Sequence, residues 1–118
     1  MKKLSLEGLK FEATELDIKN NIMTITLNRP EKKNAINNVM MNEINYALAY
    51  AKQERNVRVV VIAAKGDIFC AGADLSRAES SSNVPKIEKA DDISLAIRHL
   101  YKPVICKIQG SVLAGALL

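Results

Sequence analysis

The stretch that decides the fold is Phe69-Cys70-Ala71-Gly72-Ala73-Asp74-Leu75, which follows an apolar run over residues 57–64 and a short turn. A second segment, Gly110-Ser111-Val112-Leu113-Ala114-Gly115, follows another apolar run over residues 104–108. Short apolar runs of this kind are typical of buried strands. Glycine permits the tight turns and close backbone approach that a strand exit needs. The sequence therefore predicts two loops whose backbone N–H groups face the space beyond a sheet edge.

Upstream of these loops, the sequence predicts a β-hairpin and a helix. Residues 11–16 and 22–27 alternate in the way expected of paired strands, with a turn over residues 17–21. Asn37 is a suitable N-cap for a helix over residues 38–55, whose apolar residues recur at helical spacing. These elements place strands before a helix, as an α/β chain does.

Downstream, the pattern continues to alternate. Residues 57–64 are too apolar to face water and are expected to form a strand buried on both faces. Residues 77–89 are polar and should form a loop or frayed helix, followed by a short helix with its apolar stripe over residues 93–100. A strand over residues 104–108 and the start of a helix over residues 114–118 complete the order ββα-β-α-βα. This order predicts the α/β class.

Composition narrows the functional classes. The 118 residues allow one domain, and 48% hydrophobic with 25% charged residues is typical of a soluble globular protein. The longest uncharged stretch, residues 108–118, is far shorter than the roughly 20 residues that span a bilayer, and Met1–Leu4 is not expected to begin a secretory signal. A net charge of +4 with only 4% aromatic residues argues against a nucleic-acid partner.

The cysteine and histidine content argues against a disulfide framework and against a metal site. Cys70 and Cys106 are too few for a disulfide framework, so reduced thiols and a cytoplasmic location are expected. His99 is the only histidine and cannot make a zinc site with two distant cysteines, so no metal is expected. It is expected to be exposed on its helix.

Three segments together carry a family resemblance: residues 28–36, residues 69–75, and Lys102-Pro103-Val104-Ile105 with the glycine segment that follows. They resemble the enoyl-CoA hydratase/isomerase superfamily, the crotonase-like proteins. The resemblance implies a crotonase-like (ClpP/crotonase) spiral of ββα units that is truncated here. Residues 1–118 would then be the N-terminal portion, about half, of a complete domain.

The resemblance implies an acyl-CoA thioester substrate and a role for both glycine segments. The backbone N–H groups of Ala73 and Gly115 would form an oxyanion hole, which stabilises negative charge on the thioester oxygen of an enolate. No separate cofactor is implied, because CoA is part of the substrate. The positions implied to bind the substrate are Arg29, Lys33, Ala35, Ala71, Gly72, Asp74, Leu75, Leu113 and Leu118.

One position departs from the hydratases of this superfamily. They carry a glutamate three residues after the glycine that matches Gly115, where this chain has Leu118. Adding water to a double bond uses two carboxylates, one to activate water and one to deliver a proton. Leu118 therefore favours an isomerase-like enzyme over a two-glutamate hydratase, and a decarboxylase remains open.

Two alternatives stand beside the enzyme. The first is a truncated, non-catalytic crotonase-like fragment that binds CoA. The second is an unrelated small α/β nucleotide-binding domain, because Gly110 and Gly115 have the glycine spacing of a P-loop. Ala116 and Leu117 stand where that loop needs lysine and serine or threonine, which argues against it. For the full-length parent the resemblance implies a homotrimer or hexamer.

Overall fold

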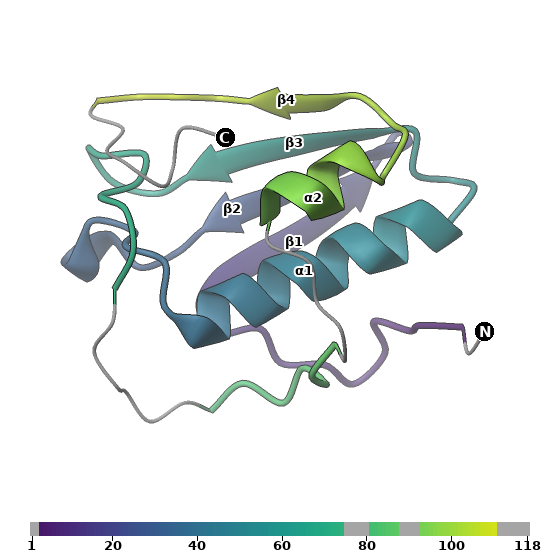
Figure 1. The fold of residues 1–118 in the computed structure, drawn as a ribbon, viewed down its shortest axis with the longest axis horizontal. Helices are drawn as coiled ribbons and strands as arrows, with labels where there is room; N and C mark the ends of the chain where they lie inside the picture. Colours follow the sequence, from purple (N-terminus) through teal and green to yellow (C-terminus); the bar gives the residue numbers. More distant parts are fainter. Residues whose placement is uncertain (1–2, 75–80, 88–92, 111–118) are drawn as a thin grey trace.

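The computed structural model of the chain describes residues 3–74, 81–87 and 93–110 (Figure 1). In these ranges the elements are β1 (Thr14–Lys19), β2 (Ile22–Leu27), the 3₁₀ helix η1 (Pro30–Lys32), α1 (Asn38–Gln53), β3 (Val59–Ala64), α2 (Ile93–Arg98) and β4 (Val104–Cys106). The strands form one sheet in the order β1-β2-β3-β4, with both α-helices against one face. The predicted α/β class is confirmed. The helix expected to begin at Ala114 lies outside the described residues.

The hairpin is confirmed, with a tighter turn than expected. β1 and β2 pair antiparallel, and Lys19 lies opposite Ile22, which leaves Asn20 and Asn21 as a two-residue loop. Both have positive φ, 53° and 67°, as a type I′ turn requires. Asparagine tolerates this conformation, so the strand continues to Lys19 instead of ending at Leu16.

Helix α1 covers the sheet and begins where the sequence predicts. The side chain of Asn37 accepts a hydrogen bond from the N–H of Met40 at 2.9 Å, which confirms the N-cap. Its apolar face carries Met40, Ile44 and Leu48, all buried against the strands. The helix ends at Gln53, two residues before the predicted end. Among the described helices, none is long and apolar enough to cross a membrane.

The three strands that follow the hairpin turn run parallel. Ile22 pairs with Val59, and Val60 pairs with Val104. The carboxyl ends of β2, β3 and β4 therefore meet at one edge of the sheet. In open parallel sheets that edge is where ligands bind.

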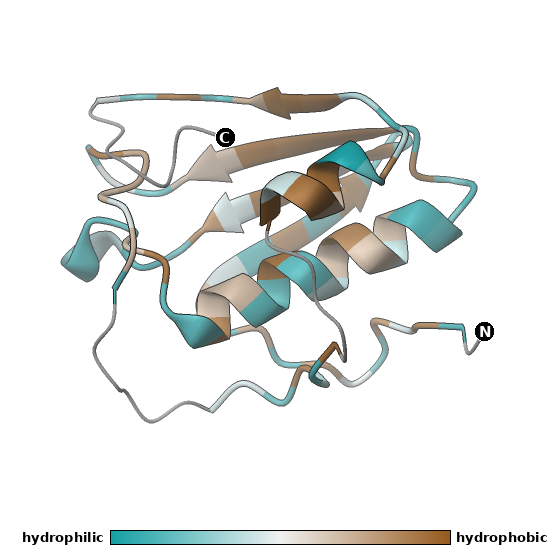
Figure 2. Cartoon of the chain, in the orientation of Figure 1, coloured by the Kyte–Doolittle hydropathy of each residue, from teal (hydrophilic) through white to brown (hydrophobic). Residues whose placement is uncertain are grey.

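One face of the sheet carries no described helix, which corrects the expectation for β3. Val60 is fully buried toward α1, whereas its neighbours Val59 and Val61 are only half-buried. Ile105 on β4 is 54% exposed on the same open face. Figure 2 shows the hydrophobic colouring of both strands. The apolar run over residues 57–64 is therefore buried on one side only within the described part of the chain.

Candidate active site

Three loops meet at the carboxyl edge of the parallel strands. Residues 28–36 follow β2, residues 65–74 follow β3, and residues 107–110 follow β4 (Figure 1). They contain residues 28–36, residues 69–74 of the second segment and Gly110 of the third, whereas residues 102–105 lie before and within β4. The fold thus gathers segments that lie far apart in the chain.

Asn34 joins the first two loops. Its side chain is fully buried, and its Oδ1 accepts a hydrogen bond from the N–H of Arg29 at 2.8 Å. Its Nδ2 donates to the carbonyls of Lys65 and Ile68, at 2.7 and 2.9 Å. The backbone of Asn34 has φ of 55°, which asparagine adopts more readily than most residues. One amide side chain therefore fixes both the turn after β2 and the loop after β3.

A short parallel bridge aligns the two loops next to this amide. The N–H of Ile36 donates to the carbonyl of Gly72, and the N–H of Asp74 donates to the carbonyl of Ile36, both at 2.8 Å. The N–H of Ala71 donates to the carbonyl of Lys33 at 3.0 Å. Loop 65–74 is thus held by its backbone on the side that faces residues 33–36.

The bridge directs the N–H of Ala73 away from Ile36. In an extended segment, neighbouring residues point their N–H groups to opposite sides, so the bonds of Gly72 and Asp74 to Ile36 turn Ala73 N–H away. The neighbouring N–H groups all have acceptors within the chain. Ala71 and Asp74 donate to the carbonyls of Lys33 and Ile36, and Gly72 donates to the sulfur of Cys70. Ala73 N–H has no partner among the described residues, and Ala73 is exposed.

The third loop lies directly on the second. The N–H of Phe69 donates to the carbonyl of Gln109 at 3.0 Å, and the Gln109 amide donates to Ala64 O and Gly66 O. Gly110 has φ of +61°, and a Cβ there would lie 1.9 Å from the carbonyl oxygen of Asp67. Only glycine fits this approach. The segment that leads toward Gly115 therefore starts beside the loop of Ala73.

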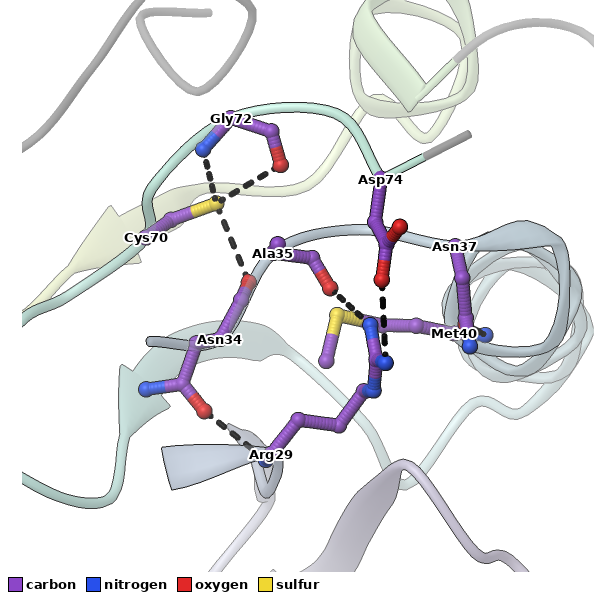
Figure 3. Close-up of polar contacts among 8 residues, drawn as sticks. All are labelled: Arg29, Asn34, Ala35, Asn37, Met40, Cys70, Gly72 and Asp74. Carbon is purple, nitrogen blue, oxygen red and sulfur yellow. Dashed lines mark hydrogen bonds and ion pairs between the residues drawn. The ribbon is translucent and has the colours of Figure 1, made fainter. Parts of the chain in front are cut away.

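Arg29, which the resemblance implies to bind the substrate, has its charge turned inward. Its side chain is 11% exposed, and its guanidinium donates to the carbonyl of Ala35 and to the Asp74 carboxylate, the latter at 3.1 Å (Figure 3). η1 and the two left-handed residues that follow turn the chain back beneath the guanidinium. Lys33, with φ of 54°, is exposed beside it. Of the two basic residues implied to bind the substrate, Arg29 is largely buried and Lys33 is exposed.

Cys70 is packed inside the same turn. Its Sγ lies 3.2 Å from the carbonyl of Asn34 and accepts the N–H of Gly72 at 3.4 Å (Figure 3). Burial raises the pKa of the thiol, and the Gly72 backbone contact lowers it by less. A raised pKa keeps the thiol protonated at neutral pH, so Cys70 packs here as a small, uncharged side chain.

Several expected site residues are not placed. Leu75, Leu113, Gly115 and Leu118 lie outside the described residues. Conversely, Asn34 and Gln109 were not singled out from the sequence, although both organise the site. The one available signal was a polar residue in a loop that follows a strand, and the partners in the neighbouring loops lie too far along the chain to be inferred.

Comparisons with known proteins agree with this arrangement. The sequence profile of the family "Enoyl-CoA hydratase/isomerase" matches residues 17–118. A trans-2-decenoyl-[acyl-carrier-protein] isomerase of Streptococcus mutans is 35% identical over 92% of this chain and 43% of its own length. A 1,2-epoxyphenylacetyl-CoA isomerase of Escherichia coli is 32% identical over 84% of this chain and 40% of its own length.

Solved structures give the same answer for the fold. An enoyl-CoA hydratase of Mycobacterium smegmatis superimposes with a TM-score of 0.67 at 34% identity, covering 82% of this chain and 40% of that one. One from Mycobacterium avium gives 0.67 at 31% identity, covering 90% and 42%. The chain thus spans about two-fifths of the relatives it matches. It has a truncated crotonase-like fold and belongs to the enoyl-CoA hydratase/isomerase family.

Proposed function

We propose that the full-length gene product, meaning the complete protein that contains this chain, transforms acyl-CoA thioesters through an enolate intermediate. A base removes a proton next to the thioester carbonyl, and the electron pair moves onto the carbonyl oxygen. The N–H groups of Ala73 and Gly115 donate hydrogen bonds to that oxygen. Fixed donors of this kind stabilise the developing charge without reorganising.

The observation that supports the proposal most directly is the unpaired N–H of Ala73 within the described ranges. Its flanking N–H groups at Gly72 and Asp74 are used within the chain, whereas that of Ala73 has no partner in the described ranges. It lies at an exposed residue on the carboxyl edge of the sheet. The second donor, Gly115, stays a prediction, supported by the contact of Gln109 and Gly110 with the loop of Ala73.

Within the family we propose isomerase chemistry, in which a proton leaves one carbon and is returned to another. Leu118 supplies no carboxylate where hydratases have one, and hydration needs two. Two similar relatives are named isomerases, from S. mutans and E. coli. The base would lie beyond residue 118, in the full-length gene product. By the same reasoning the chain alone would bind CoA without turnover.

The test removes the donor itself. Proline has no N–H, so Ala73→Pro in the full-length gene product should lower kcat for an enoyl-CoA by about 10²–10³-fold. Ala73→Gly, which keeps the N–H, is the matched control and should stay within a few-fold of wild type. Mass spectrometry of the product separates the chemistries, since hydration adds the mass of one water and isomerisation adds none. Equal kcat for both variants would overturn the role of Ala73.

Which carrier holds the acyl group is a separate question, and the name of one relative bears on it. The S. mutans relative is named for an acyl-carrier-protein thioester instead of a CoA thioester. Both carriers present the same phosphopantetheine arm, so the second candidate is the same reaction on acyl-carrier protein. Comparing kcat/KM for one acyl chain on the two carriers decides between them. A preference of about tenfold or more for the carrier protein would replace CoA in the proposal.

Two further properties belong to the proposal for the full-length gene product. It would act in the cytoplasm as a homotrimer or hexamer, without a cofactor beyond the substrate's own CoA. Sedimentation of the full-length gene product measures the oligomeric state, and a monomer would contradict this part.

A further inference from the structure

A largely buried ion pair adjoins the proposed oxyanion donor. The Arg29 guanidinium contacts the Asp74 carboxylate at 3.1 Å, and their side chains are 11% and 16% exposed. Asp74 directly follows Ala73 in the chain. A charge pair shielded from water is held more firmly than one at the surface, because solvent screens it less.

The same guanidinium also contacts its own loop, residues 28–36. A second N–H group of Arg29 donates to the carbonyl of Ala35, the residue before Ile36 (Figure 3). The N–H of Arg29 is itself fixed by Asn34. Arg29 therefore connects the two segments whose bridge, between Ile36 and Ala73, sets the direction of the Ala73 N–H.

We propose that Arg29 is a positioning residue: by holding Asp74 and Ala35 together, it fixes the Ala73 N–H in the direction needed to polarise the thioester carbonyl. This inference rests on the proposed function of Ala73. Arg29 then acts through Asp74 and touches no substrate, which differs from the substrate-binding role that the resemblance implies. The phosphates of CoA would be left to exposed groups such as Lys33.

The geometry gives the expected size of the effect. A misplacement of about 1 Å at a catalytic group can cost roughly 10²-fold in rate. Arg29→Met keeps much of the side-chain volume and removes all five donors. In the full-length gene product it should lower kcat by about 10- to 100-fold. KM for the acyl-CoA should change by less than about threefold, because the phosphate-binding groups are untouched.

The partner variant and their combination test whether the two residues act as a unit. Asp74→Asn removes the negative charge at constant shape and should lower kcat to a similar degree. Both changes break the same contact, the one between Arg29 and Asp74. The kcat of the double variant should therefore resemble that of the worse single variant, and the two losses should not multiply. Arg29→Lys, which keeps the charge, should recover part of kcat. Glu15→Gln, which breaks the exposed Lys65–Glu15 pair, is the control and should leave kcat unchanged.

A spectroscopic readout separates positioning from general damage. A conjugated enoyl-CoA absorbs at longer wavelength when its carbonyl accepts hydrogen bonds, so the shift on binding reports polarisation per bound ligand. Arg29→Met should bind this probe and show a much smaller shift than wild type. Folding is checked by the thermal transition of the ligand-free protein.

Each result has one meaning. A full shift in Arg29→Met, or independent losses in the double variant, overturns the positioning role. Weaker binding of CoA thioesters but not of pantetheine thioesters, with an unchanged shift, assigns Arg29 to the phosphates instead and also overturns it. If the wild type itself neither shifts nor turns over the probe, the proposed function has failed.

Discussion

At the scale of single residues, Glu43 is a buried carboxylate that serves the fold. It is fully buried on α1 and accepts the N–H groups of Glu12 and Ala13, at 2.7 and 2.9 Å, and the hydroxyl of Thr14. In Glu43→Gln, one carboxylate oxygen becomes a donor that faces another donor. We expect a loss of about 1–3 kcal/mol in the free energy of unfolding, measured by urea denaturation of the full-length gene product. The same change at exposed Glu15 should cost at most about 1 kcal/mol.

The two cysteines should differ in reactivity. Cys70 is fully buried and Cys106 is exposed, and burial raises the pKa of both thiols. A raised pKa lowers the thiolate fraction at neutral pH below that of an unperturbed cysteine, so reaction with an alkylating reagent should increase as pH rises toward that pKa. Mass spectrometry of the 118-residue chain should show Cys106 labelled first and Cys70 only on unfolding. Labelling of Cys70 at the rate of Cys106 in the folded chain would contradict the packing described here.

At the scale of elements, the C-terminal end of helix α1 is capped by the side chain of Lys102, which lies far along the chain. The ammonium of Lys102 donates to the carbonyls of Ala51, Glu54 and Val57, at 2.5, 2.9 and 2.6 Å. A cation at a helix C-terminus is favourable, and hydrogen bonds to charged groups are the stronger ones. Lys102→Met should therefore lower the free energy of unfolding by about 2 kcal/mol. Exposed Lys19→Met is the control, and equal losses would show that Lys102 contributes only its charge.

The elements that the sequence predicts well are those with local signals. The strand over residues 22–27 and the Asn37 cap follow from alternation and from a side chain that bonds three residues away. The contacts of Asn34 to the loop after β3 and those of Lys102 to the end of α1 could not be predicted, because these partners lie 31–34 and 45–51 residues away. The loop of Ala73 was identified from its glycine, but the bridge that orients it depends on Ile36, in a different loop. Local chemistry thus predicts where a strand ends, and tertiary contacts decide which N–H remains unpaired.

At the scale of the whole molecule, the open face of the sheet changes in polarity from one edge to the other. One register row runs Asp17, Thr24, Val61 and Ile105, from β1 to β4. Asp17 at one end is charged, whereas Ile105 at the other is 54% exposed. The charged end is suited to solvent, and the apolar end over β3 and β4 is suited to being covered (Figure 2). The chain spans about two-fifths of its relatives, so further sequence is available in them to cover this end.

This change in polarity predicts which part of the surface promotes self-association of the isolated chain. Exposed contiguous apolar surface promotes association, so the 118-residue chain produced alone should bind a hydrophobic dye and self-associate in sedimentation. Ile105→Thr should reduce both, because it interrupts the apolar end of the row. Ile18→Thr removes an equally apolar side chain that is 38% exposed and pairs with Met23, on the face toward α1. If that control reduces dye binding as much as Ile105→Thr, association does not depend on the open face. In the full-length gene product, where the apolar end is expected to be covered, dye binding should fall and Ile105→Thr should instead destabilise the fold.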